Sequence, residues 1–206
     1  MKKIKVLIAD DHAIVRMGLA SILGTKRDLE VVGDAEDGAD AVRKAQKLRP
    51  DVVLMDIVMP EMDGAAATAE IRRLLPSARV LILTSFGEAD GIAHALKAGA
   101  SGALMKNIDY SELVEAIRTI ASGGTVIAPE IERMLKESPP LPDLTDRQRE
   151  ILLSMSRGLT DADIARQLDL TPNSVREHIT TIFRKLGAAN KTEAVAIALR
   201  KHLLKI

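Results

Sequence analysis

The sequence predicts an α/β domain with a five-stranded parallel sheet, followed by a small all-α domain. Over residues 1–122, short apolar runs alternate with amphipathic helical patterns, whereas residues 143–206 hold only helical patterns. The charge divides in the same way, since the first segment has 16 basic and 18 acidic residues and the last has 11 and 8. A basic C-terminal part within a neutral chain favours a second domain with an anionic partner.

The composition is typical of a folded protein, with 47% hydrophobic and 28% charged residues among 206. No apolar run is long enough to span a bilayer, and Met1-Lys2-Lys3 leads into a strand pattern rather than a signal peptide. We therefore expect a cytoplasmic protein with no membrane partner. The chain has no cysteine, which excludes disulfides and thiol catalysis.

Short apolar runs mark the strands of the first domain. We predict strands at residues 4–9, 29–33, 52–55, 80–83 and 103–105. Val15, Leu19 and Ile22 form one face of the first helix, another helix ends near Gly99, and a further one starts near Asp109. Repeated β–α units with short connections favour a parallel sheet covered by helices on both faces.

Asp56 is placed where a parallel sheet binds ligands. It directly follows the apolar run 52–55, and Pro60 prevents the strand from continuing. In open α/β sheets, ligands bind at the carboxyl ends of the strands. Taken alone, an aspartate here also fits a turn former or a helix cap.

Four other polar residues follow predicted strands, namely Asp10, Asp11, Thr84 and Lys106. In a flavodoxin-like strand order 2-1-3-4-5, the three aspartates converge at the topological switch point. Carboxylates so close repel one another unless a cation neutralises them, and an oxygen-only ligand set suits Mg²⁺. A nearby hydroxyl and ammonium group could then bind a phosphoryl group on Asp56, as phosphoryl transfer requires.

Each of these residues also has a plain structural interpretation. Asp10 and Asp11 could cap the following helix, Thr84 could be an ordinary strand residue, and Lys106 could be a solvated lysine. The occurrence of all of them at strand ends, in order, favours a common site.

The histidines are dispersed without the spacing of metal ligands: His12, His94, His178 and His202.

The first domain resembles the receiver domain of bacterial two-component response regulators. The matching elements are Asp10-Asp11, Asp56, Met59-Pro60, Gly64, Thr84 and Lys106. The resemblance implies that Asp56 is the phosphoacceptor and that Asp10, Asp11, Asp56 and the backbone carbonyl of Val58 hold Mg²⁺. It also implies that a sensor histidine kinase is the phosphodonor.

The same resemblance assigns roles to the fourth and fifth strands. Thr84 would supply the hydroxyl that moves to the phosphoryl group, and Lys106 its counter-ion. Ala103 departs from the pattern, because related receivers usually carry an aromatic switch residue three positions before the lysine. This departure leaves open whether the receiver depends on phosphorylation at all.

Residues 123–142 are expected to link the two domains. Gly123-Gly124 closes the first domain, and Pro129 could be the first residue of a short helix that continues over 130–136. The following run Ser138-Pro139-Pro140-Leu141-Pro142 favours an extended, semi-rigid connection.

The last segment predicts four helices with clear boundaries. Thr145 and Gln148 form a capping box, and the second helix begins at Thr160. Thr171-Pro172 begins a third helix that ends before Gly187, and Asn190 and Glu193 mark the start of a fourth. A tight connection between the second and third helices predicts a helix-turn-helix.

The outward side of the third helix is polar and basic. Its outward residues are Asn173, Arg176, Glu177, Thr180, Thr181 and Arg184. Those near the helix N-terminus could reach base edges, while Arg184, Lys185 and Lys191 suit DNA phosphates. A helical docking module with a solvated basic face is the alternative.

The segment resembles the LuxR-type helix-turn-helix, and the whole chain resembles the NarL/FixJ response regulators. The matching stretches are 144–152, 158–165, 174–178 and 184–187. The resemblance implies base contacts by Arg176, Glu177 and Thr180, and DNA binding as a homodimer on paired half-sites. Its dimerisation helix corresponds to the stripe Val195, Leu199 and Leu203, which could equally be intramolecular core.

A phosphatase with an aspartyl nucleophile is the competing enzyme class. Such an enzyme of the haloacid dehalogenase type needs a second aspartate two residues after the nucleophile as the acid/base, and Val58 occupies that position. We therefore expect a regulator rather than an enzyme, in which phosphorylation of Asp56 controls dimerisation and DNA binding. The alternative is a DNA-binding regulator that works without phosphorylation.

Overall fold

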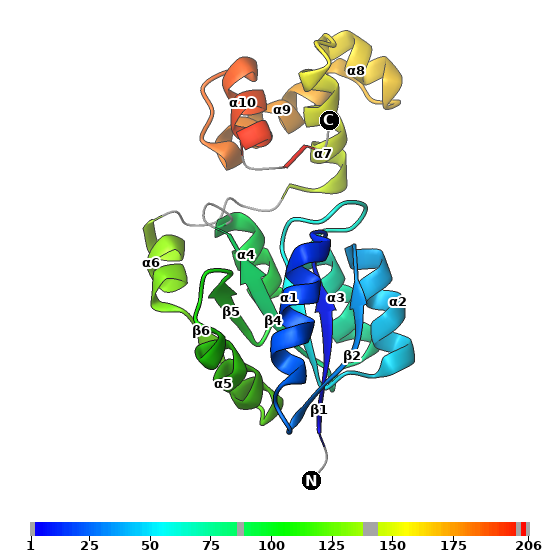
Figure 1. Ribbon diagram of the computed structural model, residues 1–206. Helices are drawn as coiled ribbons and strands as arrows, with labels where there is room; N and C mark the ends of the chain where they lie inside the picture. The colour runs from blue at the N-terminus through cyan, green and yellow to red at the C-terminus, as the bar shows by residue number, and fades with distance from the viewer. Residues whose placement is uncertain (1–2, 86–88, 138–143, 201–202, 205–206) are drawn as a thin grey trace. The chain divides into compact units, whose positions relative to one another are not determined.

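A computed structural model describes residues 3–85, 89–137, 144–200 and 203–204 (Figure 1). The chain divides into two compact units, Met1–Pro140 and Leu141–Ile206. Each unit has its own hydrophobic core. Among the described residues, every helix is too short or too polar to cross a bilayer.

The first unit is built on a parallel sheet with the strand order β2-β1-β3-β4-β5-β6. The strands are β1 (Ile4–Ala9), β2 (Leu29–Ala35), β3 (Val52–Asp56), β4 (Arg79–Thr84), β5 (Gly102–Met105) and β6 (Val126–Ile127). The predicted order 2-1-3-4-5 is confirmed. The short sixth strand was not predicted, because two residues give no periodicity to detect.

Helices cover both faces of this sheet (Figure 1). They are α1 (Ala13–Gly24), α2 (Gly38–Leu48), α3 (Gly64–Leu74), α4 (Ala89–Lys97) and α5 (Tyr110–Ala121). Right-handed crossovers put α1 on one face and α2, α3 and α4 on the other, where α3 packs against both neighbours. The chain reverses its direction across the sheet between β1 and β3, which creates the switch point there.

The core of the first unit follows most of the predicted apolar patterns, although α1 buries Leu19 and Leu23 and not Ile22. All residues of β3 are buried, as expected for a central strand that helices cover on both faces. The predicted helix near Asp109 is α5, which buries Leu113, Ile117 and Ile120 against the sheet. Gly99 lies just beyond α4 with φ of +101°, as expected for a glycine that ends a helix.

The expected linker of residues 123–142 is wrong in its first part. Residues 126–137 form β6 and α6 (Pro129–Glu137), and these elements belong to the first unit. The backbone N–H of Ala128 donates to the carbonyl of Ala103 (3.0 Å), and Ile131 is fully buried. Pro129 does begin a helix, as predicted, but β-pairing and an apolar contact hold that helix on the first unit. The proline-rich run 138–142 lies outside the described residues.

The second unit contains α7 (Asp146–Ser156), α8 (Asp161–Gln167), α9 (Pro172–Leu186) and α10 (Lys191–Arg200). The predicted start signals are confirmed, since Thr145 and Gln148 form a capping box and the Thr171 side chain accepts a hydrogen bond at the start of α9. Gly187 ends α9 with φ of +67°. α9 packs against α7, α8 and α10, so it is the central helix of this unit.

Candidate functional site

Asp56 is the last residue of β3 and is 3% exposed. The backbone N–H of Ile57 donates to its Oδ1 atom (2.8 Å), which fixes the direction of the carboxylate. Gly64 lets the following loop return closely, because its N–H donates to the carbonyl of Ile57 (2.9 Å) and a Cβ atom there would lie 1.9 Å from the carbonyl oxygen of Asp56. The loop after Asp56 therefore depends on a glycine at position 64.

Asp10 and Asp11 follow β1 at the same edge of the sheet. Asp10 is 2% exposed, and its Oδ1 atom accepts the backbone N–H of His12 (2.8 Å). The N-cap residue of α1 is His12, with no side-chain hydrogen bond to the helix, so the helix-cap interpretation of the two aspartates is wrong. Their carboxylates instead face the end of β3.

Lys106 lies between the two buried carboxylates. Its Nζ atom is 2.7 Å from Oδ2 of Asp56 and 2.9 Å from Oδ2 of Asp10. Burial alone would lower the pKa of the Lys106 ammonium, but hydrogen bonds and charge attraction from Asp56 and Asp10 outweigh it, so the pKa is raised above the usual value. The lysine is therefore not a freely solvated one, and it partly neutralises the carboxylates.

Thr84 and Lys106 are connected through the backbone, since the N–H of Lys106 donates to the carbonyl of Thr84 (2.8 Å). Thr84 ends β4, one residue beyond Leu83, the register partner of Asp56. Its side chain is fully buried, and its hydroxyl donates to the carbonyl of Ser85 (3.3 Å). The hydroxyl is thus held near the pocket on the neighbouring strand.

Two further positions were singled out by the resemblance to receiver domains. Val58 lies in the loop two residues after Asp56 with an exposed side chain, as expected if only its backbone serves the site. Ala103 is fully buried on β5, between its partners Ile82 on β4 and Ile127 on β6. At the position where related receivers usually carry an aromatic switch residue, this chain therefore has a small residue inside the sheet.

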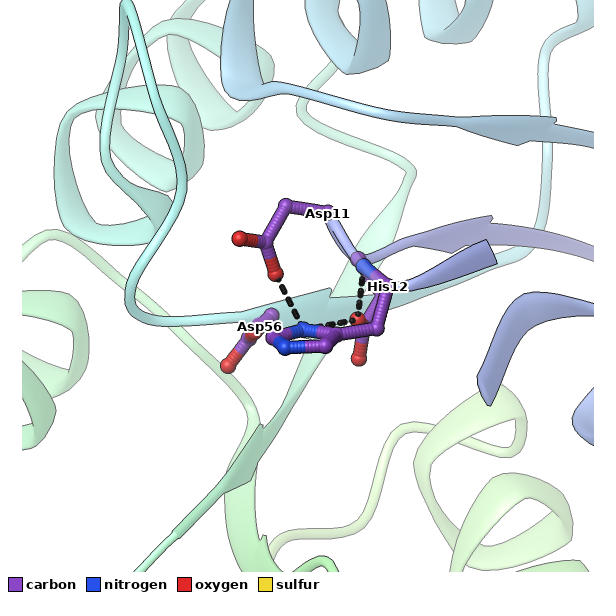
Figure 2. Close-up of side chains that lie close together, drawn as sticks. Asp11, His12 and Asp56 are labelled. Atoms are coloured by element: carbon purple, nitrogen blue, oxygen red, sulfur yellow. Dashed lines mark hydrogen bonds and ion pairs between the residues drawn. The ribbon is translucent and has the colours of Figure 1, made fainter. Parts of the chain in front are cut away.

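The three aspartates converge as predicted. One ligand atom from each of Asp10, Asp11 and Asp56, together with one from His12, lies within 4.8 Å of the others (Figure 2). A set of carboxylate oxygens suits a hard divalent cation such as Mg²⁺. His12 was not predicted as a ligand, because the histidines lack the regular spacing of metal ligands and this cluster joins the ends of two separate strands.

Arg16 is a second residue near the site that the sequence did not predict. Its guanidinium donates to the carbonyl of Asp10 (2.7 Å) and to Oδ2 of Asp34 at the end of β2 (2.8 Å). These bonds join the chain after β1 to the neighbouring strand and so support the position of Asp10. A single arginine one turn into a helix gives no sequence signal for such a role.

The predicted DNA-contacting residues of the second unit differ in their exposure. Asn173, Arg176, Glu177, Thr180 and Arg184 are exposed, whereas Thr181, Lys185 and Lys191 are half-buried. The buried face of α9 is formed by Val175, Ile182 and Leu186. The outward face of α9 thus carries five of the eight residues that were predicted to meet DNA, while Lys191 lies on α10.

Three of the basic residues already contact their own unit. Lys185 donates from Nζ to Oε1 of Gln148 (2.9 Å), and Lys191 donates to the carbonyl of Leu159. Arg176 is 3.8 Å from Asp161 on α8, a long ion pair in solvent that contributes little. Phosphate contacts by Lys185 or Lys191 therefore require these internal bonds to be exchanged.

The stripe Val195, Leu199 and Leu203 is divided between core and surface, and α10 ends at Arg200, before Leu203. Val195 and Leu203 are partly buried against the core of the second unit, while Leu199 is 42% exposed. The residues that face the core fully are Ala194 and Ala198. The intramolecular alternative thus explains part of the stripe, and dimerisation through Leu199 stays a prediction.

Two family descriptions match the chain, one for each unit. "Response regulator receiver domain" matches residues 6–118, and "Bacterial regulatory proteins, luxR family" matches residues 142–198. The chain belongs to the two-component response regulators with a LuxR-type DNA-binding helix-turn-helix. Members of this family are regulators rather than conventional enzymes, in agreement with the rejection of a phosphatase.

Full-length relatives share this organisation. The response regulator protein VraR of Staphylococcus epidermidis is 39% identical, and the alignment covers 98% of this chain and 99% of that protein. The crystal structure of response regulator ChrA, from a heme-sensing two-component system, is 34% identical with a TM-score of 0.59, over 99% of this chain and 100% of ChrA. An RcsB–DNA complex is similar in fold, with 24% identity, a TM-score of 0.64 and coverage of 97% and 99%.

Proposed function

We propose that a sensor histidine kinase transfers a phosphoryl group to Asp56, and that this event controls dimerisation and DNA binding by the second unit. A carboxylate oxygen of Asp56 would attack the phosphorus atom, form an acyl phosphate and release the donor imidazole. The regulator would act in the cytoplasm, where its DNA partner lies. The family supports the general scheme, and the pocket supports the choice of residues.

The observation that carries this proposal is the position of Lys106. Its ammonium contacts one oxygen each of Asp56 and Asp10, while the other oxygen of each carboxylate accepts a backbone N–H, so both carboxylates are fixed and partly neutralised. A buried carboxylate with a fixed ammonium beside it is suited to bear a phosphoryl group, because positioning and charge neutralisation supply most of the catalysis of phosphoryl transfer. A simple turn or cap would need neither burial nor a counter-ion.

Asp10, Asp11, Asp56 and the backbone carbonyl of Val58 would hold Mg²⁺ in this scheme. The fit rests on the donor set, in which the three carboxylates offer oxygen atoms close enough to share one ion. Bound there, Mg²⁺ would neutralise charge on the transferring phosphoryl oxygens. Thr84 would donate its hydroxyl to a phosphoryl oxygen and so give up its bond to the carbonyl of Ser85.

The new group would add a charge of about −1.5 to −2 to a pocket that is already acidic. Lys106 and Thr84 would move toward it, and β4 and β5 would carry the change because the two residues share a backbone hydrogen bond. In the second unit, Arg176, Glu177 and Thr180 would contact bases. The DNA backbone would be contacted by Asn173, Thr181, Arg184, Lys185 and Lys191. Dimerisation would take place through Val195, Leu199 and Leu203.

Intact mass spectrometry tests the phosphoacceptor. The protein is incubated with acetyl phosphate and Mg²⁺, and the wild type is compared with Asp56→Ala and with the control Asp109→Ala, an exposed aspartate just beyond Lys106. We expect one phosphoryl group on the wild type and the control and none on Asp56→Ala. Labelling of Asp56→Ala at another residue would contradict the assignment.

One observation favours a second candidate, a DNA-binding regulator that does not respond to phosphorylation. Ala103 leaves no aromatic ring at that position of β5 to couple Thr84 to the surface. This candidate predicts that the phosphorylated and the unphosphorylated protein bind DNA with equal affinity in fluorescence anisotropy titrations. The first candidate predicts tighter binding by the phosphorylated protein, so a single pair of titrations separates the two candidates.

A further inference from the structure

His12 lies in the acidic pocket, although the receiver chemistry described above gives it no part. Its Nδ1 atom is 2.6 Å from Oδ1 of Asp11 and 3.4 Å from Oδ1 of Asp10. Figure 2 shows the imidazole ring beside the carboxylates of Asp11 and Asp56. An ion held by the three carboxylates would therefore have an imidazole nitrogen within reach.

The backbone, rather than the core, places His12 there. The residue is the extended N-cap of α1, and its N–H is bound to the carboxylate of Asp10 (2.8 Å), so its side chain leaves the chain beside the two aspartates. The side chain is 68% exposed, and packing does not require an imidazole at this position. A ring without a packing role, next to three carboxylates, is free to serve as a ligand.

The distances fit a shared ion. In an octahedral site with bonds of about 2.1 Å, neighbouring ligand atoms lie about 3 Å apart. The separation between His12 and Asp10 is already close to this value, at 3.4 Å. The shorter contact, 2.6 Å between Nδ1 of His12 and Oδ1 of Asp11, would open by about 0.4 Å if both atoms bound one ion. The exposed ring can make this movement without disturbing the core.

We propose that His12 supplies a nitrogen ligand to the metal ion of this pocket and thereby favours a first-row divalent transition-metal ion over Mg²⁺. Imidazole binds transition-metal ions well, whereas Mg²⁺ prefers oxygen ligands alone. The inference rests on the proposed metal site at Asp10, Asp11 and Asp56. It does not depend on phosphorylation of Asp56.

The test uses Mn²⁺ as the probe, with the full chain and no phosphodonor. Wild type, His12→Gln and the control His94→Gln, which changes a histidine on α4, are titrated with Mn²⁺ while free Mn²⁺ is followed by electron paramagnetic resonance. Glutamine keeps an N–H donor for Asp11 but offers no imidazole nitrogen. Mg²⁺ affinity is obtained by competition.

We expect His12→Gln to lower Mn²⁺ affinity by at least about tenfold, since even the loss of a hydrogen-bond partner of a ligand costs that much. Mg²⁺ affinity should change by less than about twofold, because an oxygen-only set remains. Pulsed paramagnetic resonance of the Mn²⁺-loaded protein should detect a nitrogen coupling that changes when histidine is ¹⁵N-labelled. His12→Gln should lose this coupling, and His94→Gln should keep it.

The outcomes separate this inference from the proposed function. Mn²⁺ binding without a nitrogen coupling, or an equal loss of both affinities in His12→Gln, would overturn the role of His12 and leave the acidic site in place. A wild-type protein that binds neither ion would overturn the metal site and the His12 inference together. Labelling of Asp56 is measured separately and bears only on the phosphoacceptor.

Discussion

The acidic pocket and the outward face of α9 hold their charges in opposite environments. In the pocket, Asp10 and Asp56 are almost fully buried, and Lys106 contacts both of them. On α9, Arg176 and Arg184 are exposed, and Arg176 lies in a long ion pair of 3.8 Å with Asp161.

This difference shows how the charges of each region are neutralised. A buried charge is costly unless the protein itself neutralises it, so the pocket is built around specific contacts. An exposed basic face costs the folded state little free energy, because water solvates its charges, and it can bind an external anion such as DNA. Substitutions in the pocket should therefore change stability and chemistry together, whereas substitutions on α9 should change binding alone.

The largest effect is expected for Lys106→Ala. Without the ammonium, two buried carboxylates face each other, and we expect the free energy of unfolding at pH 7 to fall by about 3 kcal/mol. Added Mg²⁺ should restore part of the loss, because a cation then replaces the ammonium. Tyr110 is the sole tyrosine of a chain without tryptophan, so its fluorescence during urea unfolding reports on the receiver.

Lys47→Ala provides the control, because Lys47 is exposed on α2 and should change stability by less than about 0.5 kcal/mol. The pH dependence follows from the raised pKa of Lys106 beside Asp56 and Asp10. The stabilisation is complete below the ordinary lysine pKa of 10.5 and is lost as the pH rises through the raised value. If Lys106→Ala and Lys47→Ala were equally stable at neutral pH, the pocket would not differ from an exposed surface in its need for a counter-ion.

A smaller effect is expected from Gly64→Ala, which adds a Cβ atom against the carbonyl oxygen of Asp56. We expect the free energy of unfolding to fall by about 1–3 kcal/mol, as for other overpacked sites, and the labelling of Asp56 to slow. Gly18→Ala in α1 meets open space, so the same substitution should stabilise the receiver by about 0.5–1 kcal/mol. Urea unfolding followed by tyrosine fluorescence measures the stability of both variants. Changes of equal sign would contradict the close approach of the loop at Gly64 to the carbonyl of Asp56.

The sequence predicted those features that depend on local rules. The buried strand before Asp56, the capping box of Thr145 and Gln148, and the start of α9 at Thr171-Pro172 each follow from a few neighbouring residues. The convergence of the aspartates followed from one further rule, because carboxyl ends of adjacent parallel strands meet at one edge of a sheet.

Features that depend on long-range packing were missed. The place of His12 beside Asp56 depends on how β1 and β3 end together, and the bond from Lys191 to the carbonyl of Leu159 joins segments 32 residues apart. β6 has two residues and is stabilised by pairing with β5, which no local pattern reveals. These contacts arise only when separate elements meet.

The smallest effect on stability is expected for Arg184→Ala on the outward face of α9. The free energy of unfolding should change by less than about 0.5 kcal/mol, because the side chain is exposed. DNA binding should nevertheless weaken, and the slope of log affinity against log salt should fall by about 1, as expected for one lost phosphate contact. Arg157→Ala, an exposed arginine after α7, is the control, and an equal slope in both variants would argue against this contact.

The central claim is that the acidic pocket controls the DNA-binding unit, and one measurement tests it directly. DNA affinity is measured by fluorescence anisotropy with and without beryllofluoride, which mimics the phosphoryl group, for the wild type and for Asp56→Asn in the presence of Mg²⁺. The account predicts that beryllofluoride increases the affinity of the wild type and leaves Asp56→Asn unchanged. An unchanged wild-type affinity, with beryllofluoride bound at Asp56, would contradict it.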